Sequence, residues 1–377
     1  MSCRNFLCGL EMLLISISCT SKHESLYRGN YRLSKQVGWL DSVIVSADST
    51  SGRGNFFMQD SSIYFADAYY ASIFQYRAID GAFISRHFTL GQGPNELSAF
   101  LYAYPFKRGK GECFIVDNSL NVYSYQKNDF LLKEKGVVNF GWNKVQRDNY
   151  DSPSVYNVME MSDFGINFTY LNDSTLLMPV SLVNRYLSDI NSKRYEKGHI
   201  LAELDTRNMQ IRKVVGRFPS IYKEKPTPFF EFFNYVLRGD TLYVNHAVDS
   251  LIYVYKYPDR LLYTMGYEAP NVNRSYTIGY NADIFHFKED CKRVGTNMGL
   301  IYIKEQNLLL RTVLKSFKSR QVCLQAYWGT DLVLEANMPD FFKFLGYYNN
   351  YFYGVKMLPL ETADGRMSFV FYRFKIE

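Results

Sequence analysis

The chain has 377 residues, and 47% of them are hydrophobic, so a large core is available and wholesale disorder is excluded. Its 43 basic and 37 acidic residues give a formal charge of +6 but form no basic run, which argues against a nucleic-acid partner. The 32 Tyr and 29 Phe suit half-buried strands first, and ligand stacking second.

Residues 1–19 have the features of a secretion signal. A positive charge precedes an apolar stretch over residues 6–17, which is too short to span a bilayer, and small residues follow it. Cys19 ends a Ser-Cys pair that resembles a bacterial lipobox, in which the cysteine is acylated and becomes the mature N-terminus. Glu11 and Ser16 depart from that motif, so an ordinary signal peptide is the alternative.

This leader predicts an exported protein that acyl chains hold at the outer membrane or another periplasm-facing membrane. No later stretch is long and apolar enough to span a bilayer, so we expect no other membrane-spanning segment. Residues 20–35 are polar and charged, and we expect them to form a tether. Residues 36–377 are then the folded domain.

Four stretches of the chain repeat one pattern, in which a short turn joins two β-rich runs. They begin at Asp60, Glu112, Asp240 and Gly299. A recurring unit of about fifty residues made of short strands is typical of a propeller blade. We therefore predict an all-β fold, a six-bladed β-propeller whose blades have four antiparallel strands; five or seven blades fit the length less well.

The expected blades follow one another along the chain. They cover about 55–88, 103–135, 167–205, 230–267, 294–336 and 339 to the C-terminus. Residues 141–156 interrupt the pattern as an insertion or long loop, and 184–197 are the best candidate for a short surface helix or flap. Residues 39–46 form a strand without a hairpin partner, which in a closed propeller pairs with the last blade, here with residues 367–376.

A glycine-rich turn follows the outer strand of the first blade. Residues 90–97 read Leu-Gly-Gln-Gly-Pro-Asn-Glu-Leu, and few other residues could make this turn. A Gly-x-Gly-Pro-x-Glu turn at this place resembles the six-bladed, NHL-like or TolB-like propeller lipoproteins of the Bacteroidetes. The turn occurs once, and the remaining resemblance lies in the strand pattern over most of the chain. It implies a propeller at the bacterial cell envelope.

One face of a propeller collects the connections between blades and the loops between the two middle strands of each blade. Ligand sites gather on this face near the central channel. The candidate residues are Gln92, Asn95 and Glu96 in the glycine-rich turn, with Tyr69, Tyr70, Asn118, His246 and Asp249 in middle loops. Their groups suit a glycan or a peptide. Alternatively, Asn95 and Glu96 cap backbone amides and join blades, and the two tyrosines pack at the rim.

Catalytic motifs are missing from the sequence, and its five histidines lack metal-ligand spacing. The enzymatic alternative uses Asp67 and Asp117, which end equivalent strands of neighbouring blades. They could hold Ca²⁺ for a hydrolase or lyase, or serve glycoside hydrolysis, although such carboxylates are more often turn-formers. We expect a binding module without a cofactor, whose partner is an envelope protein, a peptide or a glycan.

Overall fold

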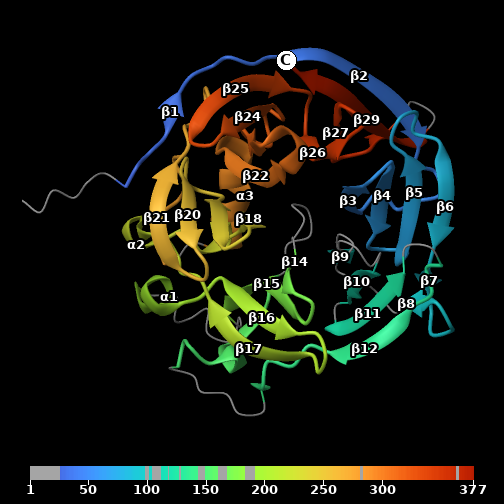
Figure 1. Ribbon diagram of the computed structural model, residues 1–377, viewed down its shortest axis with the longest axis horizontal. Helices are drawn as coiled ribbons and strands as arrows, with labels where there is room; N and C mark the ends of the chain where they lie inside the picture. Colours follow the sequence, from blue (N-terminus) through green and yellow to red (C-terminus); the bar gives the residue numbers. More distant parts are fainter. Residues whose placement is uncertain are drawn as a thin grey trace, which may run out of the picture.

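The computed structural model describes residues 26–97, 102–103, 112–117, 119–126, 129–142, 149–159, 168–182, 192–280, 283–361 and 365–377. The predicted signal and the first part of the predicted tether lie outside these residues. Six β-sheets of four or five strands stand in a ring around a common axis (Figure 1). The protein is a six-bladed β-propeller, which confirms the predicted fold class.

Four blades are built from four consecutive antiparallel strands, of which the first is nearest the axis and the last is at the rim. Blade one comprises β3 (Gly54–Gln59), β4 (Ser62–Asp67), β5 (Ser72–Arg77) and β6 (Phe83–His87). Blade two comprises β9 (Tyr102–Ala103), β10 (Glu112–Val116), β11 (Asn121–Gln126) and β12 (Lys133–Val137). Blade four comprises β18 (Phe233–Arg238), β19 (Thr241–His246), β20 (Ile252–Lys256) and β21 (Arg260–Met265). Blade five comprises β22 (Thr296–Ile303), β23 (Leu308–Leu314), β24 (Val322–Trp328) and β25 (Asp331–Met338).

Blade three has a divided inner edge. Both β13 (Tyr156–Val158) and β14 (Thr169–Asn172) pair with β15 (Thr175–Leu182), which is followed by β16 (Leu201–Asp205) and β17 (Gln210–Val215). The region predicted as an insertion over 141–156 therefore ends inside the sheet, because Tyr156 is already paired with Leu182.

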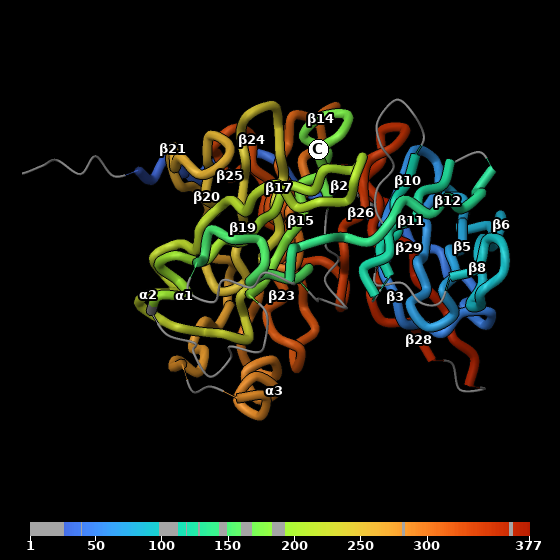
Figure 2. Tube along the Cα trace, turned by 90° about the horizontal axis from the view of Figure 1, so that it is seen from below, coloured from blue at the N-terminus to red at the C-terminus, as the bar shows by residue number. Residues whose placement is uncertain are grey.

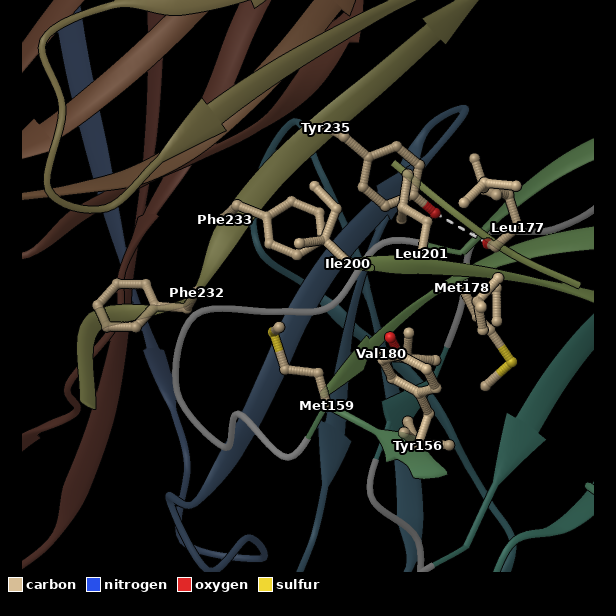
Figure 3. Close-up of a cluster of buried hydrophobic side chains, with 14 of the residues drawn as sticks. Tyr156, Met159, Leu177, Met178, Val180, Ile200, Leu201, Phe232, Phe233 and Tyr235 are labelled. Atoms are coloured by element: carbon tan, nitrogen blue, oxygen red, sulfur yellow. Dashed lines mark hydrogen bonds between the residues drawn. The ribbon is translucent and has the colours of Figure 1, made fainter. Parts of the chain in front are cut away.

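The core lies between neighbouring blades, because alternate side chains of a strand point to opposite faces of its sheet. In β3, Phe56 packs against Phe369 of blade six with ring centroids 4.9 Å apart, while the next residue, Phe57, stacks on Tyr64. Figure 3 shows the same arrangement between blades three and four, where the hydroxyl of Tyr235 donates a 2.8 Å hydrogen bond to the carbonyl of Leu177.

Blade six closes the ring with the first long strand of the chain. Its strands are β26 (Phe342–Tyr348), β27 (Tyr351–Lys356), β29 (Met367–Ile376) and, on the rim, β2 (Val37–Ser46). The antiparallel register pairs Val45 with Phe369 and Leu40 with Phe374. The predicted closure is confirmed, so the ends of the described chain meet in one sheet (Figure 1).

Residues 26–36, which we call the strap, run along the rim of the ring. Tyr27 forms a parallel bridge to Thr264 of β21, and β1 (Asn30–Tyr31) pairs in parallel with β25. Gln36 and Glu377 then exchange two backbone hydrogen bonds of 2.9 and 3.0 Å. The described part of the predicted tether, residues 26–35, is therefore bonded to blades four and five, and Gln36 continues the strap to blade six.

The described helices are short. They are α1 (Ser192–Lys197), α2 (Ser220–Glu224) and α3 (Ile284–Arg293), with 3₁₀ turns at Pro153–Val155, Pro228–Phe230 and Lys304–Gln306. Two-residue strands occur at β7 (Thr89–Leu90), β8 (Glu96–Leu97) and β28 (Leu360–Glu361). The helix α1 lies within the region predicted as a surface helix. Over the described residues, none of the helices has the length and apolar composition needed to cross a membrane.

The closure predicts a large loss of stability when Phe369 is shortened. Phe369 is fully buried and packs against Phe56 and Phe65 of blade one, at centroid distances of 4.9 and 4.7 Å. Phe369→Ala should lower the free energy of unfolding in urea by about 3–5 kcal/mol. The control Ile44→Ala, on β2 with its side chain 67% exposed, should cost less than about 1 kcal/mol. Equal losses of stability in the two variants would contradict this account of how blade six packs against blade one.

Candidate functional site

The α-helices of the described chain all leave the ring on one side, which we call the helical face. Helix α1 lies in the connection from β15 to β16, the middle strands of blade three. Helix α2 lies in the connection from blade three to blade four, and α3 in the connection from blade four to blade five. Figure 2 shows α3 and β28 on this side, at the bottom of the view. The opposite face carries tight turns, such as those at Asp240 and Thr330.

The connections that hold the predicted site residues open on the helical face, but their side chains are not gathered there. Asn118 lies outside the described residues. Gln92 is exposed in the glycine-rich turn, and this turn lies at the rim beside β12, not beside the axis as the sequence predicts (Figure 1).

Two residues of the glycine-rich turn serve the backbone. Asn95 has a left-handed φ of 61°, and its Oδ1 accepts a 2.8 Å hydrogen bond from the amide of Leu132, just before β12. Glu96 Oε2 accepts a 2.6 Å hydrogen bond from the amide of Gly93 within the turn. Asn95 thus joins blade one to blade two and Glu96 closes the turn, which is the structural alternative that the sequence left open.

Asp67 organises the middle loop of blade one. Its buried carboxylate accepts hydrogen bonds from the amide and hydroxyl of Ser51, at 2.6 and 2.7 Å. It also accepts hydrogen bonds from the backbone amides of Tyr69 and Tyr70, at 3.0 and 2.9 Å. These four donors come from two connections on the helical face, so Asp67 fixes their mutual position.

Asp117 has the same role in blade two. Its buried carboxylate accepts the amides of Ser119 and Asn121, at 2.8 and 2.9 Å, and the side-chain amide of Asn121 at 2.8 Å. The described residues contain no group of three His, Cys, Asp or Glu side chains suited to a metal ion. With protein donors on both carboxylates, the geometry favours turn formation over the calcium site.

The blade-four loop repeats this use of a carboxylate. Asp249 Oδ1 accepts the amide of Leu251 at 3.1 Å, and Oδ2 accepts the hydroxyl of Tyr253 at 2.5 Å. Asp249 is buried, so it supports the loop from inside and is not presented to a ligand.

Tyr69 and Tyr70 are the aromatic residues of the predicted site, and both present their side chains to solvent. They are 65% and 38% exposed, and their rings meet edge to face at 5.2 Å. Because Asp67 accepts the backbone amide of each, the pair stands on a fixed turn. Such a pair offers two aromatic ring faces at a steep angle, each with a hydroxyl group at its end, which suits a sugar ring or a peptide side chain.

His246 is buried within the ring instead of lining its surface. The imidazole is fully buried among the rings of Tyr222, Phe233 and Tyr253, at centroid distances of 5.4–5.8 Å. Neither ring nitrogen has a hydrogen-bond partner in the described structure, and burial lowers the pKa of His246 to about 3. The position of His246 on its strand turns the side chain into the core between blades, so it does not line the surface where the sequence predicts it.

Sequence reasoning missed a buried ion pair beneath α1. Arg194 Nε donates to Glu231 Oε1 at 2.7 Å, and a second guanidinium nitrogen bonds the other carboxylate oxygen. Both side chains are about nine-tenths buried, and the bidentate pair fastens the middle loop of blade three to the start of blade four. The two residues are far apart in the sequence, so no local pattern indicates the pair.

The fold is similar to that of solved Bacteroides proteins, whereas no protein-family model and no curated protein sequence matches the chain. One, from Bacteroides vulgatus and described as a member of the DUF4221 family, is 10% identical with a TM-score of 0.64, covering 92% of this chain and 99% of that one. Another, a predicted exported protein of Bacteroides fragilis, is 12% identical with a TM-score of 0.50, covering 93% and 99%. These likenesses concern the fold, over nearly the whole of each chain.

The buried imidazole predicts a pH dependence of stability. With a pKa of about 3 in the folded state and about 6.5 when unfolded, His246 binds a proton only in the unfolded state between these values. Stability should therefore fall as the pH drops below about 6.5, by about 2 kcal/mol at pH 5. In urea denaturation, His246→Phe should lose that much less between pH 7.5 and pH 5 than the unchanged protein does. Equal losses, or an imidazole that titrates near pH 6.5 by NMR, would show that the ring is accessible to water.

Proposed function

We propose that the protein is an exported, lipid-anchored propeller that acts as a binding module at the bacterial cell envelope. The leader and Cys19 support the anchor, and the Gly-x-Gly-Pro-x-Glu turn supports a relation to the NHL-like or TolB-like propeller lipoproteins. Acyl chains on Cys19 would hold the ring at the outer membrane or another periplasm-facing membrane.

The observation that carries the proposed function is the asymmetry between the two faces of the ring. The helical face bears the described helices α1, α2 and α3 and the exposed pair Tyr69 and Tyr70, whereas described connections on the other face, such as those at Asp240 and Thr330, are tight turns. A rigid ring that collects its long connections on one side is the usual design of a recognition surface.

The ligand we propose is a glycan or a peptide, bound on the helical face. Two exposed phenol rings on a fixed turn offer stacking surface and hydroxyl groups at little cost in conformational entropy. The fixed base matters, because a preorganised pair loses less freedom when the ligand binds.

A calcium-dependent hydrolase or lyase is the weaker alternative. Its carboxylates, Asp67 and Asp117, already accept three or more protein hydrogen bonds each. Since a calcium ion needs six to eight oxygen ligands, binding here would have to displace turn amides. We therefore favour recognition without catalysis.

The anchor is tested by Cys19→Ala in the full-length protein. Without the acyl chains, most of the protein should move from the membrane fraction to the soluble fraction of the cell extract, because surface contacts alone hold a protein to a bilayer only reversibly. Metabolic labelling with a fatty acid should mark the unchanged protein and not the variant. Unaltered membrane association without label incorporation would exclude the lipid anchor.

The ligand face is tested with the mature protein on a glycan array and a peptide library. Tyr69→Ala and Tyr70→Ala should each weaken binding to the ligands found by about tenfold or more, as expected for aromatic contact residues. The matched control is Trp328→Ala, since Trp328 is 60% exposed at a turn on the opposite face. Loss of binding in the control but not in the tyrosine variants would place the site on the other side of the ring.

A further inference from the structure

Helix α3 stands out from the helical face between blades four and five (Figure 2). Asp283 caps its N-terminus, and the carboxylate of Asp290 holds it to the preceding segment by accepting the amide and hydroxyl of Thr277 at 2.6 and 3.0 Å. The helix is thus a fixed projection of the ring. Its inner side carries Phe287 and Asp290, and its outer side remains uncovered.

The outer side begins with apolar side chains. Phe285 is 71% exposed, Ile284 is 44% exposed, and Ile278, on the segment beside the helix, is 54% exposed. Single exposed apolar residues are common, but the neighbouring residues Ile284 and Phe285 are both exposed at the start of a projecting helix, which favours a contact surface.

Basic side chains follow this apolar tip. Lys288 and Lys292 lie one and two turns further along the exposed side of α3, where Lys292 Nζ is paired with the carboxylate of the exposed Glu289 at 2.6 Å. The blade-five loop continues the patch, because its backbone is bonded to the end of α3 through Phe317 and Lys318, and Arg320 is exposed beside them. Ile284, Phe285, Lys288, Lys292, Phe317, Lys318 and Arg320 together are the α3 patch.

The strap limits where the anchor can hold the ring. It begins at Leu26, whose carbonyl accepts the amide of Thr264 of blade four at 2.9 Å. Residues 20–25 alone separate it from Cys19, and at full extension they reach about 25 Å. An acylated Cys19 would therefore keep blades four and five close to the bilayer, although the strap and α3 lie at opposite ends of the view in Figure 2.

We propose that the α3 patch docks on the anionic headgroups of the membrane that carries the protein. This inference rests on the proposed lipid anchor. An apolar tip followed by lysine and arginine is the composition of helices that lie at a bilayer interface, and the short reach from Cys19 raises the local concentration of that surface. Phe285 and Ile284 enter the interface, the cations contact lipid phosphates, and the ring is held in one orientation.

The test uses the mature chain from residue 20 onward, which lacks acyl groups and keeps every described residue. It should co-sediment with vesicles of phosphatidylcholine and phosphatidylglycerol, less with phosphatidylcholine alone, and less at high salt. Phe285→Ser should weaken partitioning about tenfold, and Lys288→Glu about fivefold or more. Phe83→Ser, at a 58% exposed position on β6 of blade one, should leave it unchanged.

The outcomes separate this proposal from the anchor itself, because the assay uses protein without acyl chains. Absence of vesicle binding, or binding that ignores Phe285→Ser and Lys288→Glu, overturns the docking surface whatever Cys19 does. If the two variants instead abolish self-association in sedimentation velocity, with no effect on vesicles, the α3 patch is a contact between copies of the chain.

Discussion

The structure depends on the pairing of β2 with β29. Each blade buries the two faces of its sheet against its neighbours, so the ring has no natural end. Without β2, blade six would lose its rim strand, and β29 would expose a row of unpaired amides and carbonyls. The strap extends the same seam, because Gln36 and Glu377 bond to each other and β1 covers the edge of β25. The two ends of the described chain thus complete the fold together.

A closed ring leaves the connections free to differ. The strands are constrained by two neighbouring blades, whereas a connection on the helical face needs only to span two strand ends. Buried aspartates in the middle loops then give those connections fixed shapes, as Asp67 does for Tyr69 and Tyr70. The buried ion pair between Arg194 and Glu231 likewise holds α1 in a fixed position. Because the strands are constrained and the connections are free to vary, the helical face is a rigid surface of variable composition.

The blades could be predicted from the sequence because short aromatic and β-branched runs separated by turn residues recur at a regular interval. The rim strand β2 was predictable because a strand without a hairpin partner needs one elsewhere. The burial of His246 was not, since an imidazole beside a turn looks the same whether its strand directs it inward or outward. The sequence predicts a tether in place of the strap because residues on the rim stay exposed to solvent and need no apolar pattern. Tyr31 is 54% exposed and Leu33 is 48% exposed.

Amide hydrogen exchange of β2 in the folded protein tests the closed ring most directly. If β2 is an integral strand of blade six, the amides that it bonds to β29 should exchange only when the whole domain unfolds, as slowly as those between β27 and β29. Exchange of β2 that is orders of magnitude faster than that of β27, at the rate of an unpaired segment, would mean that the ring is open at this seam.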